Sequence, residues 1–292
     1  MAACRRWTKV PYPAVAGFFI LPNVYATRKL LLACVLVLGC TRVAAEPQNP
    51  LEDRFSVSVG TFLFETDTQL HVDGSTRRGT DLDAERDLGI GNTDSVRLDA
   101  YWRFAPRHKV RVVYFSTQRS ALKVIDQQID YGDVTFPANA EVSSRFKTEV
   151  AELAYEYAFM RRDTFELAGS AGVHNLRFGL DLSSERQGVT AALQRDANAN
   201  GPLPVIGLRA VWRFGDRLHL DAQAQFFRIS FNQYDGHLSD YNVTLVWMPL
   251  DHFGLGAGYN EFITHVDVSA DQFNGGLRWR YSGARIFVNA SF

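Results

Sequence analysis

Two sets of residues have side chains and spacing that could support catalysis. Glu156 and Glu166 flank a predicted turn, and paired carboxylates of this kind can share a proton and act as a general acid. Glu166, Ser170 and His174 fall on one face of a predicted strand and have the composition of a hydrolase site. Residues four positions apart in a strand lie roughly 13 Å apart, so Ser170 cannot touch His174 without a bulge. Basic residues on the neighbouring strands favour an ion-pair network over catalysis.

Metal and cofactor motifs are weak. An acidic run in the first long loop lacks the spacing of a calcium loop, so we expect it to be solvated or in loose contact with divalent ions beside lipopolysaccharide: Asp81, Asp83, Glu85 and Asp87. After residue 45 the chain has no cysteine, no phosphate-binding glycine loop and no Gly-x-Ser-x-Gly motif. We therefore expect no metal site and no cofactor.

Charge is distributed unevenly along the chain. Six of the 31 basic residues and none of the 32 acidic residues lie in the first 45 positions, which leaves 25 basic against 32 acidic residues and a net charge of −7 for the rest. A nucleic-acid partner requires a basic surface that neutralises phosphates, so this balance argues against one. All three cysteines also lie in this first segment, so the remainder can cross an oxidising compartment without wrong disulfides.

The first 45 residues have the order of a secretory signal peptide. Arg28 and Lys29 precede an apolar run, 30–39, that is too short to span a bilayer, and Val43-Ala44-Ala45 provides small residues for cleavage. We predict cleavage after Ala45. The alternative is a lipoprotein site at Cys40. Residues 1–23 add a second apolar stretch without a role, which suggests a true translation start near Val24.

The rest of the chain repeats strands of alternating polarity. In 95–104, 206–214 and 218–225 the even positions are apolar or aromatic and alternate with mostly polar odd positions, and in 151–159 the odd positions are the apolar or aromatic ones. Short turns near 105–107, 161–163, 215–216 and 249–251 alternate with longer polar segments at about 74–93, 127–146 and 184–202. Outer-membrane barrels have short periplasmic turns and long outer loops. A soluble β-sandwich is the alternative that alternation by itself leaves open.

Aromatic residues cluster beside the short turns. This placement predicts an interfacial girdle at one rim of a barrel, formed by Trp102, Phe104, Tyr157, Phe159, Trp212, Phe214, Trp247 and Phe253.

The chain ends in a strand whose apolar residues alternate down to a terminal Phe292. This end resembles the last strand of Gram-negative outer-membrane β-barrel proteins, whose final aromatic residue is read by the assembly machinery. The resemblance implies an all-β fold with a single antiparallel transmembrane barrel and both termini in the periplasm. It also implies outer-membrane lipid, lipopolysaccharide and the assembly machinery as partners.

A narrower resemblance concerns the loops. Asp81, Asp83 and the sequence Asp235-Gly236-His237 resemble the acidic and Asp/His pairs at the outer rim of omptin proteases, which are ten-stranded barrels. Asp235-Gly236 also has the composition of a two-residue hairpin turn, which needs no catalytic reason.

We predict a short periplasmic segment, 46–52, followed by a barrel, 53–292, of about ten strands; eight or twelve are the alternatives. The predicted strands are 53–72, 94–104, 108–125, 147–160, 164–182, 204–214, 217–232, 237–248, 252–268 and 271–292. In 165–182 and 253–268 the apolar residues change from odd to even positions, which predicts a β-bulge in each strand.

Polar residues that alternate with lipid-facing ones must face the lumen. Hairpin registers pair Arg103 with Lys109 and Arg213 with His219, and place Glu156 opposite Glu166. Because unpaired buried charges are costly, we predict an ion-pair network at the turn end of the lumen. The expected pairs are Arg111 with Glu152 or Glu156, and Glu166 with Arg209 or Arg213; Asp221 and His219 belong to the same network.

These observations predict a non-enzymatic barrel, either a structural or surface protein or a narrow channel for polar solutes. The alternative is an outer-membrane lipid hydrolase or an omptin-like protease with its active site at the rim.

Overall fold

The computed structural model describes residues 49–292 apart from 77, 185–192, 232–233 and 271–272. The predicted signal peptide, its cleavage after Ala45, the Cys40 alternative and the start near Val24 all lie outside the described residues. Among the described residues, no helix is long and apolar enough to cross a bilayer.

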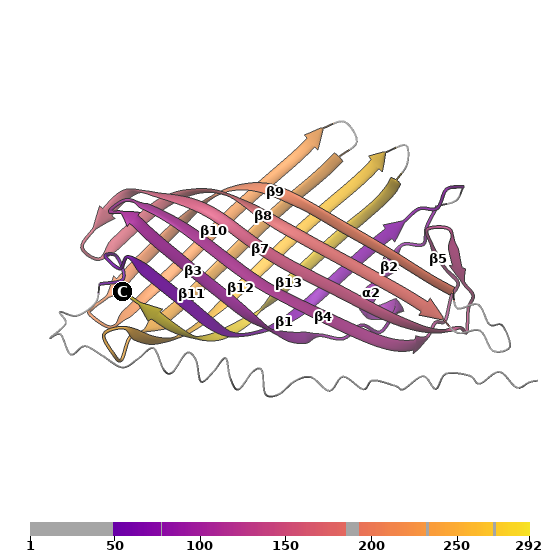
Figure 1. The fold of residues 1–292 in the computed structure, drawn as a ribbon, viewed down its shortest axis with the longest axis horizontal. Helices are drawn as coiled ribbons and strands as arrows, with labels where there is room; N and C mark the ends of the chain where they lie inside the picture. The colour runs from indigo at the N-terminus through magenta and orange to yellow at the C-terminus, as the bar shows by residue number, and fades with distance from the viewer. Residues whose placement is uncertain (1–48, 77, 185–192, 232–233, 271–272) are drawn as a thin grey trace, which may run out of the picture. The chain divides into compact units, whose positions relative to one another are not determined.

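Ten long antiparallel strands of the described chain form one closed sheet (Figure 1). Each strand pairs with its neighbour along the chain, and pairing of the first with the last closes the barrel. The strands are β1 (Phe55–Val72), β3 (Thr93–Ala105), β4 (His108–Val124), β7 (Glu141–Arg162), β8 (Phe165–Ser184), β9 (Leu193–Phe214), β10 (Leu218–Phe231), β11 (Tyr234–Trp247), β12 (Phe253–Ala270) and β13 (Phe273–Ser291).

The predicted barrel of ten strands and its single long last strand are confirmed. β7 and β9 begin earlier than predicted, so two of the long loops are shorter than the sequence suggested. The predicted hairpin turn at Asp235-Gly236 is wrong, because these two residues pair with Ser230 and Ile229 inside the β10–β11 ladder. The connection between these strands falls at 232–233, outside the described residues.

The two ends of the barrel differ, and we call them the turn rim and the loop rim. Short turns join β3 to β4, β7 to β8, β9 to β10 and β11 to β12 at the turn rim, where the C-terminus also lies (Figure 1). Seven predicted girdle residues are 42–52% exposed at this rim: Trp102, Phe104, Tyr157, Phe159, Trp212, Phe214 and Trp247. Phe253, the eighth, is half-buried.

The two predicted bulges are absent. β8 pairs in an unbroken register with β9 from Phe165 to Ser184, and β12 pairs without a break with both of its neighbours. Even residues of β8 therefore face the lumen along the whole strand, including Leu176, Phe178 and Leu180. The apolar residues move from odd to even positions because the lumen changes from polar to apolar along the strand, while the backbone stays regular.

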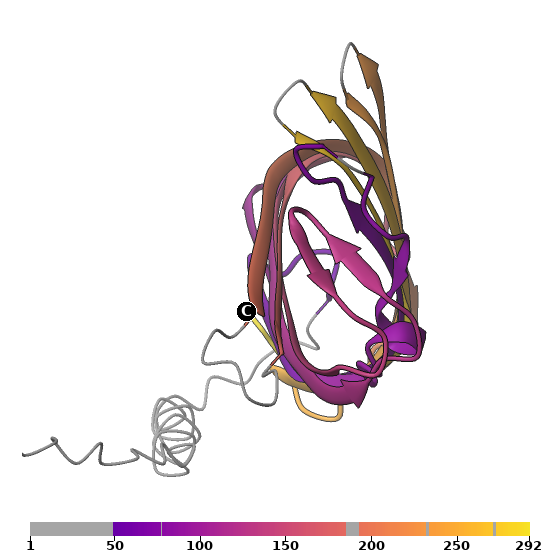
Figure 2. The ribbon, with the colours of Figure 1, turned by 90° about the vertical axis from the view of Figure 1, so that its right-hand side faces the viewer.

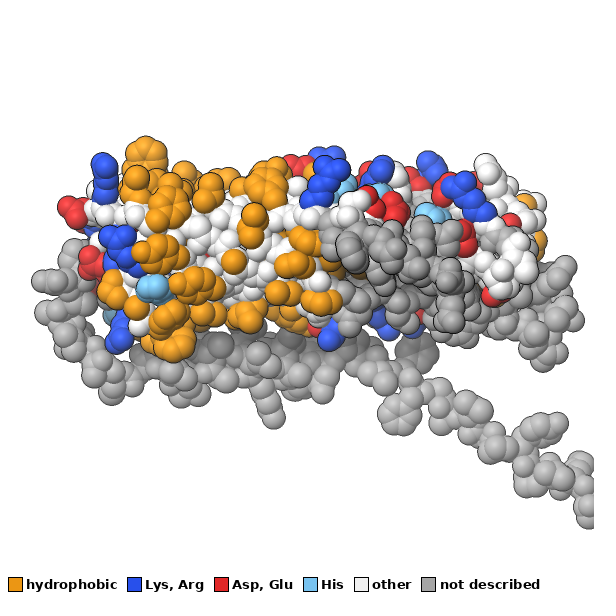
Figure 3. Space-filling model, turned by 90° about the horizontal axis from the view of Figure 1, so that it is seen from above, with side chains coloured by type: hydrophobic (Ala, Val, Ile, Leu, Met, Phe, Trp, Pro, Cys, Tyr) orange, Lys and Arg blue, Asp and Glu red, His pale blue; other side chains and the backbone are white. Residues whose placement is uncertain are grey.

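That change divides the barrel into two halves. Near the turn rim the lumen is polar and the outer surface apolar, as a membrane requires. Near the loop rim the lumen is apolar and the outer surface charged, as in a soluble barrel (Figure 3). The strands contain 13 to 22 residues, which exceeds the 9–11 or so that cross a bilayer. The loop-rim half therefore projects beyond the apolar band.

Two register shifts do occur among the described residues, at places that the sequence did not suggest. The register of β3 with β4 shifts between Arg103 and Ala105, and that of β7 with β8 shifts between Ala158 and Met160. The hairpin turn also lies at 163–164 instead of the predicted 161–163, so Glu156 faces Ser170 and Glu152 faces His174. The predicted pairing of Glu156 with Glu166 is therefore wrong. The registers predicted for the β3–β4 and β9–β10 hairpins are confirmed.

Two loops fold over the loop rim and cap it. The first contains β2 (Leu82–Asp83) and α2 (Ala84–Asp87), and the second contains β5 (Ile129–Tyr131) and β6 (Val134–Phe136), which form a small hairpin. This hairpin lies across the barrel opening (Figure 2). The loops bond to each other, with Thr80 N–H donating to the Asp130 carbonyl at 2.8 Å. Ala84, Leu88, Ile129 and Phe136 join the buried core.

Candidate functional site: a charged lumen below an aromatic core

The layer of the lumen nearest the turn rim is organised around Glu166. This carboxylate is 1% exposed and accepts from Arg103 Nη1 at 2.8 Å. Lys109 Nζ also contacts it, and Arg161 Nε lies 3.6 Å away. The bulge and turn of the β7–β8 hairpin bring Arg161 opposite Glu166. Three cations from three strands thus surround one buried anion.

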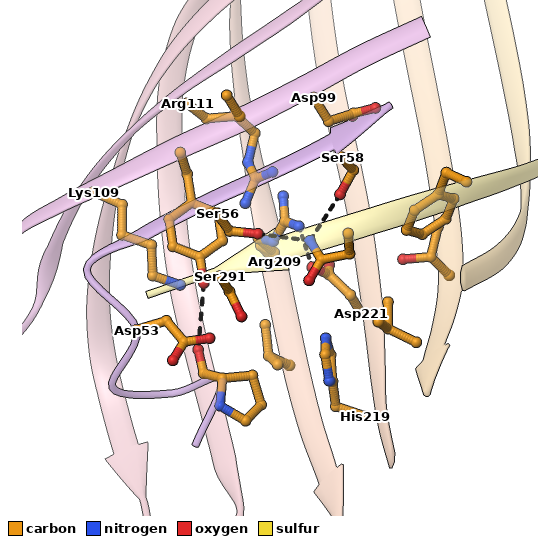
Figure 4. A pocket seen from close by; sticks show the side chains of 18 of the residues that line it. Asp53, Ser56, Ser58, Asp99, Lys109, Arg111, Arg209, His219, Asp221 and Ser291 are labelled. Carbon is orange, nitrogen blue, oxygen red and sulfur yellow. Dashed lines mark hydrogen bonds and ion pairs between the residues drawn. The ribbon is translucent and has the colours of Figure 1, made fainter. Parts of the chain in front are cut away.

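The next layer is a chain of ion pairs that crosses the lumen. Glu156 Oε1 accepts from Arg111 Nε at 2.8 Å and lies 3.4 Å from Arg209 Nη1. Arg209 also contacts Asp221 and donates to Gln223 at 2.9 Å. These side chains converge from β4, β7, β9 and β10, and the close-up shows several of them pointing into one space (Figure 4).

A second group of charges completes this layer from the opposite wall. Asp99 accepts from Arg97 Nε at 3.1 Å and from Arg285 Nη1 at 2.7 Å. Sequence reasoning did not assign these three residues to the network. Their alternation with lipid-facing residues was the available signal, since Arg97 and Asp99 share the polar face of one strand. Arg285 carries the same signal, because it alternates with Ala284 and Ile286 in the terminal strand.

The predicted network is present in part with different partners. Of its two predicted partners, Arg111 pairs with Glu156, and Glu152 lies beside His174 instead. Glu166 does not pair with Arg209 or Arg213, because the shifted hairpin moves it to a different layer. Arg213 lies 3.9 Å from the exposed Asp216 near the turn rim. His219 lines the cavity next to Asp221.

The cavity within this charged layer is small. It measures about 50 Å³ and is lined by Asp53, Tyr101, Lys109, Arg209, His219 and Asn289, among others (Figure 4). A volume of this size holds a few water molecules. Asp53 lies ahead of β1 at its edge and is 5% exposed. Burial raises the pKa of this carboxyl to about 6.

Above the charges, aromatic side chains fill the lumen. Phe62, Phe115, Phe262, Trp279 and Tyr281 are each at most 1% exposed. The Phe262 and Tyr281 rings stack at 5.1 Å, and Tyr281 meets Phe62 edge-on at 5.4 Å. The Trp279 ring of β13 also lies 5.0 Å from the Phe178 ring of β8, so the aromatic layer reaches a strand that is not a neighbour in the sheet.

The first loop adds an ion pair above this aromatic layer. Glu85 of α2 lies 2.8 Å from Arg119 Nη1 and accepts from Thr68 N–H at 2.8 Å. The expectation that the acidic run is solvated is therefore wrong for Glu85. Asp83 is the N-cap of α2, and its side chain accepts from Arg86 N–H at 2.8 Å.

The candidate catalytic sets are not assembled in the described part of the chain. Glu166 is held by basic residues, and His174 contacts Gln225 at 2.8 Å and Glu152 at 3.7 Å. β8 has no bulge that would bring Ser170 to His174.

The residues that resemble the omptin pairs are also apart. A depression at the loop rim is lined by Asp81 and Asp83 together with His265 and Asp267, but its lining includes neither Asp235 nor His237. His237 faces outward, with its ring 5.4 Å from that of His265.

The sequence matches no model of a protein family and no curated protein. The structure is similar to the outer membrane protease OmpT of Escherichia coli, with a TM-score of 0.55 and 10% identity over 83% of this chain and 98% of that one. Weaker similarities include the Pseudomonas putida toluene transporter TodX (TM-score 0.34, 10% identity, 84% and 92% coverage) and Ail of Yersinia pestis (0.29, 12%, 79% and 97%).

At this level of identity the likeness to OmpT concerns the fold alone. The closed ten-stranded antiparallel sheet, the apolar outer band and the polar lumen beneath it agree with that fold. The chain therefore has the fold of an outer-membrane β-barrel.

Proposed function

We propose that this chain is a non-enzymatic outer-membrane barrel with a closed lumen, which acts as a structural or surface protein. The observation that carries the proposal is the aromatic layer of Phe62, Phe262, Trp279 and Tyr281, which lies across the barrel. A conducting barrel needs a continuous water path, whereas here a charged layer, an apolar core and a cap of two loops succeed one another along the axis from the turn rim to the loop rim. What the protein contacts must therefore lie outside the lumen.

A liposome-swelling assay tests this proposal. Barrels reconstituted into vesicles should admit no small sugar, and the swelling rate should equal that of protein-free vesicles. A porin of known conductance provides the positive control. Uptake of a small neutral sugar would favour the narrow-channel alternative instead.

Lipopolysaccharide is the lipid partner that we propose. Arg177 and Arg280 face outward, each with a side chain 54% exposed, on the part of the barrel just beyond the apolar band. Glu149 and Glu261 pair with them at 3.3 and 2.6 Å, so a phosphorylated headgroup would bind through the free donors of each guanidinium. Replacement of both arginines with glutamine should weaken binding of lipopolysaccharide micelles without changing the folded fraction. Unchanged binding would exclude this contact.

We also propose that the terminal strand serves as the assembly signal and that export uses the signal peptide cleaved after Ala45. Phe292 is 55% exposed, and its ring stacks 4.8 Å from that of His252. Its backbone pairs with Phe55, which leaves the side chain free for recognition. Phe292→Ala should slow assembly in membranes that contain the assembly machinery and leave spontaneous refolding in detergent unchanged. N-terminal sequencing of the protein from outer membranes tests the cleavage position.

A further inference from the structure

Three buried side chains between the charged layer and the aromatic core could together hold a metal ion. Glu152 on β7, His174 on β8 and Asp240 on β11 each offer one ligand atom, and these atoms lie within 4.8 Å of one another. The three residues are 3%, 2% and 3% exposed. We propose that Glu152, His174 and Asp240 bind one divalent transition-metal ion inside the barrel, with Zn²⁺ as the representative ion.

The charge balance at this position differs from that of the other lumenal acids. Asp99, Glu156, Glu166 and Asp221 each have an arginine or lysine within ion-pair distance. Among the described residues, neither Glu152 nor Asp240 has an arginine or lysine partner within 4.0 Å, and the basic group nearest to Glu152 is His174. Two adjacent buried carboxylates without a cation are costly, and a bound divalent ion would balance them.

The histidine keeps one ring nitrogen without a hydrogen-bond partner. Gln225 bridges the pair, because its Nε2 donates to Glu152 Oε1 at 2.7 Å and its Oε1 lies 2.8 Å from His174 Nε2. Since a carboxylate only accepts, this contact fixes the amide, and its oxygen must then accept from Nε2–H. The remaining nitrogen, Nδ1, is buried without a hydrogen-bond partner. In a neutral imidazole this nitrogen carries the lone pair that a metal binds.

The second carboxylate is also held in place. Asn260 Nδ2 donates to Asp240 Oδ1 at 2.6 Å, and Asn260 Oδ1 accepts from Arg97 Nη1 at 2.6 Å and from the Tyr281 hydroxyl at 3.2 Å. Metal sites commonly orient their ligands through such outer contacts. Two carboxylate oxygens and one imidazole nitrogen suit Zn²⁺ or Mn²⁺, and no thiolate is present to select softer ions.

The position suggests what the ion would do. β7 and β8 are neighbours, whereas β11 is separated from β8 by two strands. An ion shared by all three would cross-link distant parts of the wall directly below the aromatic core, where the His174 ring lies 5.8 Å from Phe262. The expected effect is a more stable barrel.

The test uses the refolded barrel in detergent, stripped with chelator and titrated with Zn²⁺ against a zinc-binding dye. We expect one ion per barrel, an X-ray absorption spectrum with one imidazole among oxygen ligands, and a higher thermal unfolding temperature when zinc is present. Glu152→Gln, His174→Gln and Asp240→Asn should each abolish all three signals. Gln225→Leu should weaken binding by about 10- to 100-fold through loss of the outer contact.

His265→Gln is the matched control, because it removes the outward-facing His265–Asp267 pair and leaves the lumen unchanged. Heat-modifiable migration of every variant verifies that it folds. Wild-type barrels that bind no zinc, or zinc binding that survives in the three ligand variants, would overturn the proposal. Loss of binding in His265→Gln would place the ion on the outer surface and would overturn it as well.

Discussion

At the scale of single residues, Glu156 and Glu166 are buried carboxylates held by cations from other strands. Glu156 is an example: it is 2% exposed and forms ion pairs with both Arg111 and Arg209. A buried pair of this kind contributes little net stability, but removal of one partner leaves the other charge unpaired.

Glu156→Gln should therefore destabilise the barrel by about 3 kcal/mol, measured by urea unfolding in detergent. Glu261→Gln is the matched control, because Glu261 pairs with Arg280 at 2.6 Å on the outer surface. Exposed pairs contribute about 0 to 1 kcal/mol. Equal effects of the two substitutions would contradict the buried network.

The buried carboxyl of Asp53 should make the free energy of unfolding depend on pH. Burial raises the pKa of its carboxyl from 3.8 to about 6, so the folded chain binds this proton more tightly than the unfolded chain. The resulting stabilisation is complete below pH 4 and is lost as the pH rises through 6.

Asp53→Asn removes this titration. The variant should match the wild type at pH 4 and be more stable at pH 8, by on the order of 2 kcal/mol. Urea unfolding at both pH values measures the difference, and a variant that is less stable at pH 8 would contradict the effect of burial.

The sequence predicts which residues enter the lumen better than which residues pair there. Arg103, Lys109, Arg111 and Arg209 follow from strand alternation. The partners of Glu166 do not, because they depend on the bulge in β7 and on a turn that lies later in the chain than predicted. Asp240 was missed since its metal-capable neighbours lie on strands distant in the sequence.

At the scale of elements, the boundary between the two halves of the barrel explains the change in apolar parity along β8 and β12. If apolar residues faced lipid along the whole strand, the change in parity would require a bulge. Instead the strand is regular: apolar residues face outward in the turn-rim half and face the lumen in the loop-rim half. The ten strands were predictable because each alternates, whereas this boundary was not.

Cysteine labelling tests the continuous register of β8. The barrel segment has no native cysteine, so single cysteines report their own accessibility. Leu180→Cys should resist a water-soluble maleimide because Leu180 is 3% exposed in the lumen, and Asp181→Cys on the outer face should react readily. A bulge before these positions would give the opposite pattern.

The aromatic layer should contribute strongly to stability. Trp279 is fully buried and lies 5.0 Å from the Phe178 ring and 4.9 Å from that of Tyr281. Trp279→Ala should cost about 3 to 5 kcal/mol. Trp247→Ala removes a girdle residue that is 52% exposed and should cost less. A larger loss of unfolding free energy for Trp247→Ala would contradict the aromatic layer as the main core.

At the scale of the whole molecule, one half of the barrel is built like a membrane barrel and the other half like a soluble barrel. Its turn-rim half is apolar outside and polar inside, and its loop-rim half is built like a soluble barrel with a capped core. This arrangement supports a stable surface that projects beyond the membrane and argues against transport through the centre.

Single-channel recording in a planar bilayer tests the closed lumen most directly. We expect the folded, heat-modifiable barrel to give no discrete openings at any salt concentration. A variant that combines Phe62→Ala, Phe262→Ala and Trp279→Ala and still folds should begin to conduct. Regular open steps from the wild-type protein would contradict the closed lumen and would make the charged layer a selectivity filter instead.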